Sequence, residues 1–202
     1  MRSPFARIGV EGSPGIGHND GPPLDAGRSW RAFSWKQARA EALPRAPLEV
    51  VRRRVARARA LGLTYPAYAS ILLGTGRDVV AFLFTAEAVG LAVRRGGWSL
   101  REDRAMRLRA LERCQRLLIA PPPVEEIAPA LRRAQNLVIE GVAPRPAEPA
   151  SLPRARSAIR GVLDPLKLPS DAVVMVGTAP EERDWSEAGR LAKFLAAEAY
   201  FR

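Results

Sequence analysis

The sequence predicts a mainly α fold with a small α/β-like part near its carboxyl end. From residue 29 to residue 142, apolar residues recur at helical spacing, and prolines and glycines separate the helical stretches. Residues 171–177, DAVVMVG, form the best strand pattern of the chain, and a helical stretch follows them. One probable strand cannot form a sheet, so these patterns favour packed helices with a single strand–loop–helix unit attached.

Residues 78–84, DVVAFLF, are ambiguous. Their valines and phenylalanines favour a strand, whereas the Thr-Ala-Glu-Ala that follows has helical composition. We expect one buried helix over residues 77–93. If residues 78–84 are a strand instead, the fold is α/β. A short similarity between residues 78–87 and 171–181, which share an Asp, paired valines and a closing Thr-Ala, would fit that alternative.

Composition divides the chain into four segments. Residues 1–28 are dense in glycine and proline and are expected to form a flexible arm. Residues 29–142 are expected to be a basic helical domain. Residues 143–153 contain four prolines and are expected to be an extended linker. Residues 154–202 would be the strand–loop–helix region.

The helices of the basic domain have recognisable ends. A first helix covers residues 29–43, and a strongly amphipathic second one runs from Leu48 to Leu61, where Gly62 can adopt the left-handed conformation. Thr64 is positioned to cap a short helix over residues 65–73.

Capping patterns also mark the later helices. Ser99 and Glu102 match a capping box, and the helix that follows would carry Cys114 and Leu118 inward. A further helix is expected over residues 124–139. Asp184 would cap the last helix.

The chain is strongly basic. Its 202 residues include 32 Lys+Arg against 21 Asp+Glu, which gives a net charge of +11. Only three of these cations are lysines, which is typical of a GC-rich bacterial genome, but such a bias does not create net charge. A basic surface attracts nucleic acid or an acidic protein, so one of these is the expected partner.

The sequence contains little that suggests catalysis or metal binding. His18 is the only histidine and Cys114 the only cysteine, and Cys114 is expected in the core. Carboxylate pairs such as Glu181 and Glu182 are expected on solvated faces. No catalytic residue, cofactor or metal is therefore expected. The lone cysteine, and the lack of a signal-like or membrane-spanning apolar run, favour a cytoplasmic protein.

Two stretches resemble known segments. Residues 16–24, IGHNDGPPL, resemble a leader segment of uncharacterised bacterial and phage proteins, which implies no activity. Residues 63–80, LTYPAYASILLGTGRDVV, resemble the helix-turn-helix of bacterial regulators, with Ala69 at the crossing, Gly74 in the turn and Arg77 starting the recognition helix. The spacing of Ala69 and Gly74 is one residue longer than in that family, and the supposed recognition helix is very apolar.

The expected function is nucleic-acid binding, most simply DNA binding, without catalysis. Arginines of the 48–61 helix would contact phosphates, and two residues of the glycine turn would contact a base or a phosphate. The candidate residues are Arg52, Arg53, Arg54, Arg57, Arg59, Thr75 and Arg77. Two alternatives stay open: an interaction module that binds an acidic protein through its arginines, and an α/β enzyme that binds a phosphorylated ligand at a glycine turn such as Gly74–Gly76.

Overall fold

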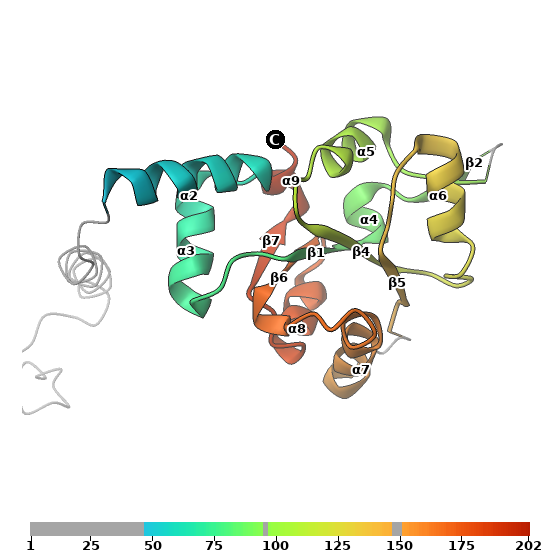
Figure 1. Cartoon of the computed structure of the whole chain (residues 1–202). Coiled ribbons are helices and arrows are strands. Elements are labelled where there is room, and N and C mark those ends of the chain that lie inside the picture. Colours follow the sequence, from blue (N-terminus) through green and yellow to red (C-terminus); the bar gives the residue numbers. More distant parts are fainter. Residues whose placement is uncertain (1–46, 95–96, 147–150) are drawn as a thin grey trace, which may run out of the picture. The chain divides into compact units, whose positions relative to one another are not determined.

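The computed structural model describes residues 47–94, 97–146 and 151–202 (Figure 1). The predicted arm at 1–28 and the predicted helix at 29–43 lie outside these residues. Residues Leu48–Arg202 form one compact unit.

A five-stranded sheet forms the centre of this unit, with the strand order β5-β4-β1-β6-β7. Every neighbouring pair of strands is parallel. The strands are β1 (Ala81–Thr85), β4 (Gln115–Ala120), β5 (Gly141–Pro144), β6 (Val173–Gly177) and β7 (Lys193–Ala196).

The two central strands, β1 and β6, have the sequences AFLFT and VVMVG, and every residue in them is buried. Parallel strands covered on both faces are continuous apolar runs without the alternation of a half-exposed strand. This is why β1 does not have an alternating strand pattern.

Helices cover both faces of the sheet (Figure 1). Phe82, Phe84 and Val176 belong to a core cluster on one face of the sheet, which we call the first face. Leu83 and Met175 belong to a second cluster on the opposite face. The first face is covered by α2 (Leu48–Ala60), α3 (Tyr65–Thr75), α5 (Glu102–Arg109) and α6 (Ile127–Gln135); the second by α7 (Leu152–Leu163) and α8 (Pro180–Ala188). The unit is therefore a three-layer α/β/α structure.

Shorter elements complete the fold. A helical turn directly follows β1, and a small antiparallel hairpin comes after it. These elements are α4 (Ala86–Val89), β2 (Ala92–Arg94), β3 (Gly97–Ser99), the 3₁₀ turn η1 (Ser170–Ala172) and α9 (Ala197–Tyr200).

The predicted mainly α class is wrong, because the described residues contain a five-stranded parallel sheet. The structure has the strand on which the α/β alternative depended, since β1 occupies most of residues 78–84. The expected buried helix over 77–93 is replaced by β1, α4 and β2. The two similar stretches, 78–87 and 171–181, contain the neighbouring strands β1 and β6.

Other predicted elements have mixed outcomes. Thr64 caps α3 as expected, and its hydroxyl accepts a hydrogen bond from Ala67 N at 3.4 Å. The capping box at Ser99 is wrong, because Ser99 belongs to β3 and α5 begins without a side-chain cap. Leu118 lies in β4, not on a helix.

Strands from both sides of the proline-rich segment join the same sheet. β5 ends within residues 143–153, and β6, which follows that segment, pairs directly with β1.

No helix in the described ranges is long and apolar enough to cross a membrane.

Candidate functional site

The sheet has one point where the direction of winding reverses. From β1 the chain moves outward through β4 to β5, and then crosses to β6 and β7 on the other side of β1. In open α/β sheets, ligands bind outside the carboxyl ends of the strands at such a switch point. The carboxyl ends of β1 and β6 are therefore the first place to look for a site.

Thr85 is the last residue of β1. It is 1% exposed, and its Oγ1 has no hydrogen-bond partner among the residues that the structure describes. It is the N-cap of α4, yet its side chain makes no capping bond. Nearly all buried polar groups in folded proteins have a partner, so an unpaired hydroxyl at a switch point requires an explanation.

An ion pair connects the ends of two strands beside Thr85. Arg145, which follows β5, pairs with Glu87 of α4. The backbone N–H of Arg145 also donates to the carbonyl of Ala120, the last residue of β4, at 2.8 Å. The Arg145 guanidinium lies 5.8 Å from the ring centre of the buried Trp185. These contacts hold Arg145 at the carboxyl edge of the sheet.

Glu182 occupies the amino end of α8. It is 1% exposed, and its Oε2 accepts hydrogen bonds from the N–H groups of Thr178 at 2.6 Å and Ala179 at 3.0 Å. Free N–H groups at a helix amino end attract anions. Here the protein's own carboxylate fills that position, which makes an exogenous phosphate on these two N–H groups unfavourable.

Except for Glu87, which is on α4 and whose helix packs in the core cluster of the first face, the edge residues share one face of the sheet. Side chains alternate along a strand, and Leu83 and Ala143 pack on the α7 and α8 side. Thr85 and Arg145 each lie two residues further on and therefore belong to that side as well. Trp185 and Glu182 come from α8. We call Thr85, Glu87, Arg145, Glu182 and Trp185 the carboxyl-edge site.

A groove opens beside this site. Its volume is about 380 Å³, and it lies between the end of β5 and α7. Arg145 and Arg154 both line it. Of the site residues, Arg145 lines the groove, and Glu87 and Glu182 are bound within the protein by Arg145 and by backbone N–H groups. The cations and the unpaired hydroxyl suit a small anionic ligand. Within the described ranges, no group of three or more His, Cys, Asp or Glu residues is arranged to hold a metal.

The arginines of α2, predicted to bind phosphates, divide into two groups. Arg57 donates to Asp78 Oδ2 and to the carbonyls of Val79 and Glu112, each at 2.8 Å, and its side chain is only 18% exposed. It connects α2 to two loops and faces inward. Arg52 pairs with Glu49 one turn earlier.

The remaining α2 cations are Arg53, Arg54 and Arg59. Arg53 and Arg59 are exposed and Arg54 is partly exposed. None of the three has a hydrogen bond or ion pair to another described residue. Arg52 is at the surface as well, since its side chain is 66% exposed, so Arg57 is the one of the five that faces inward.

The residues of the glycine turn have intramolecular partners. Thr75 Oγ1 donates to the carbonyl of Ile71 at 3.0 Å, and Arg77 pairs with Asp171 at 2.9 Å. The first helix of the helix-turn-helix-like stretch corresponds to α3, but the residues expected in its recognition helix form a loop and β1. The turn from Gly74 to Gly76 therefore links a helix to the central strand, with Gly76 at φ 71° as the helix C-cap.

Comparisons with protein-family models, with curated proteins and with solved structures found no match to this chain.

Sequence reasoning did not find the carboxyl-edge site. Glu182 was expected on a solvated face, although Pro180 marks a helix start and a Glu two residues later is well placed to cap it. Thr85, Glu87, Arg145 and Trp185 carry no local signal, because strand pairing brings them together across the chain.

Proposed function

We propose that the protein binds a small anionic ligand, of the phosphorylated kind, at the carboxyl edge of its sheet. The observation that carries the proposal is Thr85, a buried hydroxyl without a described partner at the switch point. A bound ligand would supply the missing hydrogen bond.

Arg145 supports the anionic character of the ligand. It is held at the edge by Glu87, and it lines a groove together with Arg154. An anion entering the groove would share Arg145 with Glu87 and gain Arg154, which has no described partner. Charge-assisted hydrogen bonds from guanidinium groups are the usual means by which proteins hold phosphate and carboxylate groups.

The proposal is for binding and includes no reaction. A hydroxyl becomes a nucleophile when a neighbouring base accepts its proton. No described side chain is hydrogen-bonded to the Thr85 hydroxyl, so the contacts support a ligand contact more than a nucleophile.

The first experiment is a thermal-shift screen with inorganic phosphate, sugar phosphates, nucleoside monophosphates and citrate. A ligand at ten times its Kd stabilises the native state by about 1.4 kcal/mol, which raises the Tm of a chain this size by about 3–6 °C. No shift with any probe at about 10 mM would contradict the proposal.

Two variants test whether a ligand that raises the Tm binds at the carboxyl-edge site. Thr85→Val removes the hydroxyl and keeps the shape, so the unliganded protein should be equally stable or more stable by about 1 kcal/mol, while the ligand shift is lost. Arg145→Ala should lose the shift too, whereas Arg59→Ala, which removes the same charge from α2, should keep it. If the ligand raised the Tm of Thr85→Val as much as that of the wild type, the ligand would bind somewhere else.

A second candidate function is binding to nucleic acid through α2. The observation that favours it is the group Arg53, Arg54 and Arg59, whose cations have no partner in the described part of the chain. Unpaired exposed arginines suit the backbone phosphates of nucleic acid, and they would equally suit an acidic protein.

Salt dependence tests this second candidate. Binding to random duplex DNA should weaken linearly in a plot of log affinity against log salt, and Arg53→Ala/Arg59→Ala should reduce the slope by about two. Arg57 must stay intact in this test, because it holds the fold together. Absence of binding at about 50 mM salt would exclude DNA as the partner.

A further inference from the structure

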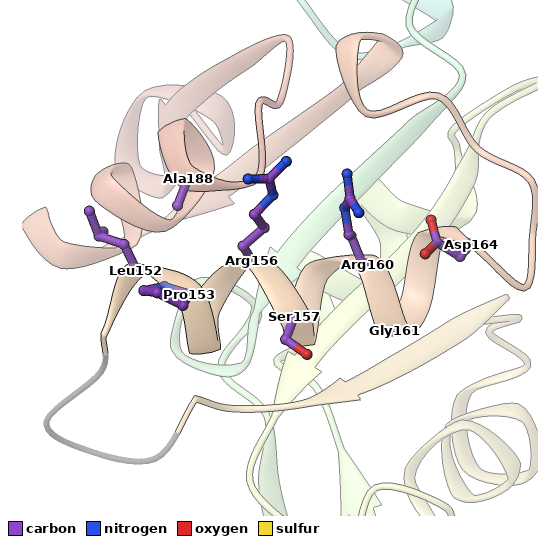
Figure 2. Close-up of a pocket in the computed structure, with 8 residues that line it drawn as sticks. All are labelled: Leu152, Pro153, Arg156, Ser157, Arg160, Gly161, Asp164 and Ala188. Atoms are coloured by element: carbon purple, nitrogen blue, oxygen red, sulfur yellow. The ribbon is translucent and has the colours of Figure 1, made fainter.

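The surface of α7 and α8 contains a groove of about 690 Å³ (Figure 2). Arg156 and Arg160 line it from α7, and Ala188 lines it from α8. Figure 2 shows both guanidinium groups projecting from the same side of α7, while Ser157 projects from the opposite side. Neither arginine has a hydrogen bond or ion pair to a described residue.

This arrangement carries an unfavourable interaction within one chain. Residues four apart on a helix are neighbours, and two like charges at that spacing repel each other. Carboxylates on a facing surface would remove the repulsion and replace it with attraction.

The neighbouring helix α8 carries such carboxylates. Glu181 and Asp184 precede Ala188 by seven and four residues, so all three lie on one side of the helix. Both acidic residues are exposed, and neither pairs with a described residue. Within α7 the charged groove-lining residues are Arg156 and Arg160, and Asp164, directly after the helix, adds one carboxylate to the lining. The stripe of α8 that leads to the groove is acidic.

The two helices pack against each other through their buried sides. Gly189, directly after α8, lies so close to Ile159 of α7 that a Cβ there would be 2.8 Å from Ile159 Cδ1. Despite this contact, no ion pair joins α7 to α8 within the described ranges. The two rows of opposite charge lie on neighbouring helices, and both are available to another molecule.

We propose that this α7–α8 face is a two-fold interface between two copies of the chain. In a two-fold dimer the same patch meets itself, so each residue pair occurs twice. A patch with one basic half and one acidic half is complementary to its own rotated copy. Arg156 and Arg160 of one copy then face Glu181 and Asp184 of the other, and the reverse contact forms at the same time.

The groove supplies the apolar part of the interface. Leu152, which is 54% exposed, lines it together with Pro153 and Ala188. Covering an exposed leucine beside an open groove removes apolar surface from water, and this favours association. The dimer covers Leu152 of both copies.

The size of the face indicates the class of interface to which the dimer belongs. The helices α7 and α8 have 12 and 9 residues, so they are about 18 Å and 14 Å long. Two helices of this length provide on the order of half of the about 800 Å² per partner found in stable complexes. The dimer therefore belongs with the small, weak interfaces.

Sedimentation velocity measures the dimer directly. Over about 5–200 µM in about 50 mM salt, the wild-type protein should shift from monomer to dimer, and raising the salt to about 0.5 M should weaken the dimer. A wild-type protein that stays monomeric over this range overturns the proposal. An acidic protein would then be the alternative occupant of the groove.

Charge reversal identifies the face. Arg156→Glu/Arg160→Glu makes both halves acidic, and Glu181→Lys/Asp184→Lys makes both halves basic. Each variant alone should dimerise at least about tenfold more weakly. Mixed in equal amounts, the two variants should form a heterodimer with close to wild-type strength, because both contact sets are again of opposite charge.

The rescue by mixing separates an interface from a folding defect, since a misfolded variant would not recover on mixing. The matched control is Arg53→Glu/Arg59→Glu, which makes the same change of charge on α2 and should dimerise like the wild type. Dimers of unchanged strength in both α7 and α8 variants, or no recovery in the mixture, would refute the proposed interface.

Discussion

Arg57, Arg107 and Arg116 each donate hydrogen bonds to backbone carbonyls of other segments. Arg57 reaches Val79 and Glu112, Arg107 reaches Gly62 at 2.9 Å, and Arg116 reaches Leu108 and Leu111. A planar guanidinium with five donors can satisfy several carbonyls at once, which a lysine cannot do. Part of the basic excess is therefore explained by the architecture, without any partner.

Cys114 is a residue whose environment favours its neutral form. It is 8% exposed, and burial raises the pKa of its thiol from 9.0 to about 12, even though the nearby Arg57 and Arg116 act in the opposite direction. Burial, together with the hydrogen bond that Tyr68 donates to Asp78, raises the pKa of Tyr68 to about 12. Burial raises the pKa of Tyr200 as well.

These raised pKa values predict a loss of stability in alkali. A group with a higher pKa in the folded state stabilises the fold fully below its unfolded pKa, and the stabilisation disappears as the pH rises toward its folded pKa. For Cys114 that window is pH 9 to about 12, and for Tyr68 it is pH 10 to about 12. Urea midpoints should therefore fall from about pH 9 in the wild type, and from about pH 10 in Cys114→Ala. An identical onset in both proteins would contradict the assignment to Cys114.

At the scale of elements, helices with local end signals were predictable and most parallel strands were not. Thr64 and Pro66 mark the start of α3, and the run of valines in β6 is bounded by turns. β1 and β4 lack alternation because both of their faces are buried. Leu118 of β4 lies four residues after Cys114, which is the spacing of neighbouring side chains on one face of a helix.

The link between α2 and the sheet gives a prediction at this scale. Arg57→Ala removes the guanidinium that donates to Asp78 and to three carbonyls, so it should lower the free energy of unfolding by about 2–4 kcal/mol. Arg59→Ala, on the same helix but exposed, should change it by about 0.5 kcal/mol or less. Equilibrium urea unfolding compares the two variants, and equal effects would mean that the internal contacts of Arg57 contribute little.

At the scale of the whole molecule, the candidate site depends on the order of strands. Thr85 and Glu182 are almost 100 residues apart in the sequence, and Arg145 comes from a third segment. Only the parallel pairing of β1 with β4 and β6 brings these segments to one edge. Sequence patterns report local periodicity, so the α/β class could be proposed as an alternative, but the residues at the switch point could not be identified.

Tyr200 connects distant parts of the molecule and gives the last prediction. Its ring lies 5.1 Å from that of Phe82 in β1, and its hydroxyl donates to the carbonyl of Leu61 after α2 at 3.2 Å. Tyr200→Phe should cost about 0.5–1.5 kcal/mol for the lost hydrogen bond, and Tyr200→Ala about 3–5 kcal/mol for the lost packing. Urea unfolding should rank the variants in this order; a mild Tyr200→Ala would show that α9 adds little to the core.

The central position of β1 has a consequence for how the chain folds during synthesis. One neighbour of β1, β4, is made soon after it, but the other, β6, pairs Val173 with Ala81 from more than 90 residues later in the chain. Until those residues leave the ribosome, one side of β1 has unpaired backbone groups and apolar side chains, which invite association with other chains. Contacts between residues so distant in sequence also form slowly. The strand at the middle of the finished sheet is thus an exposed edge for much of its synthesis, and this is the period in which the protein would most depend on chaperones.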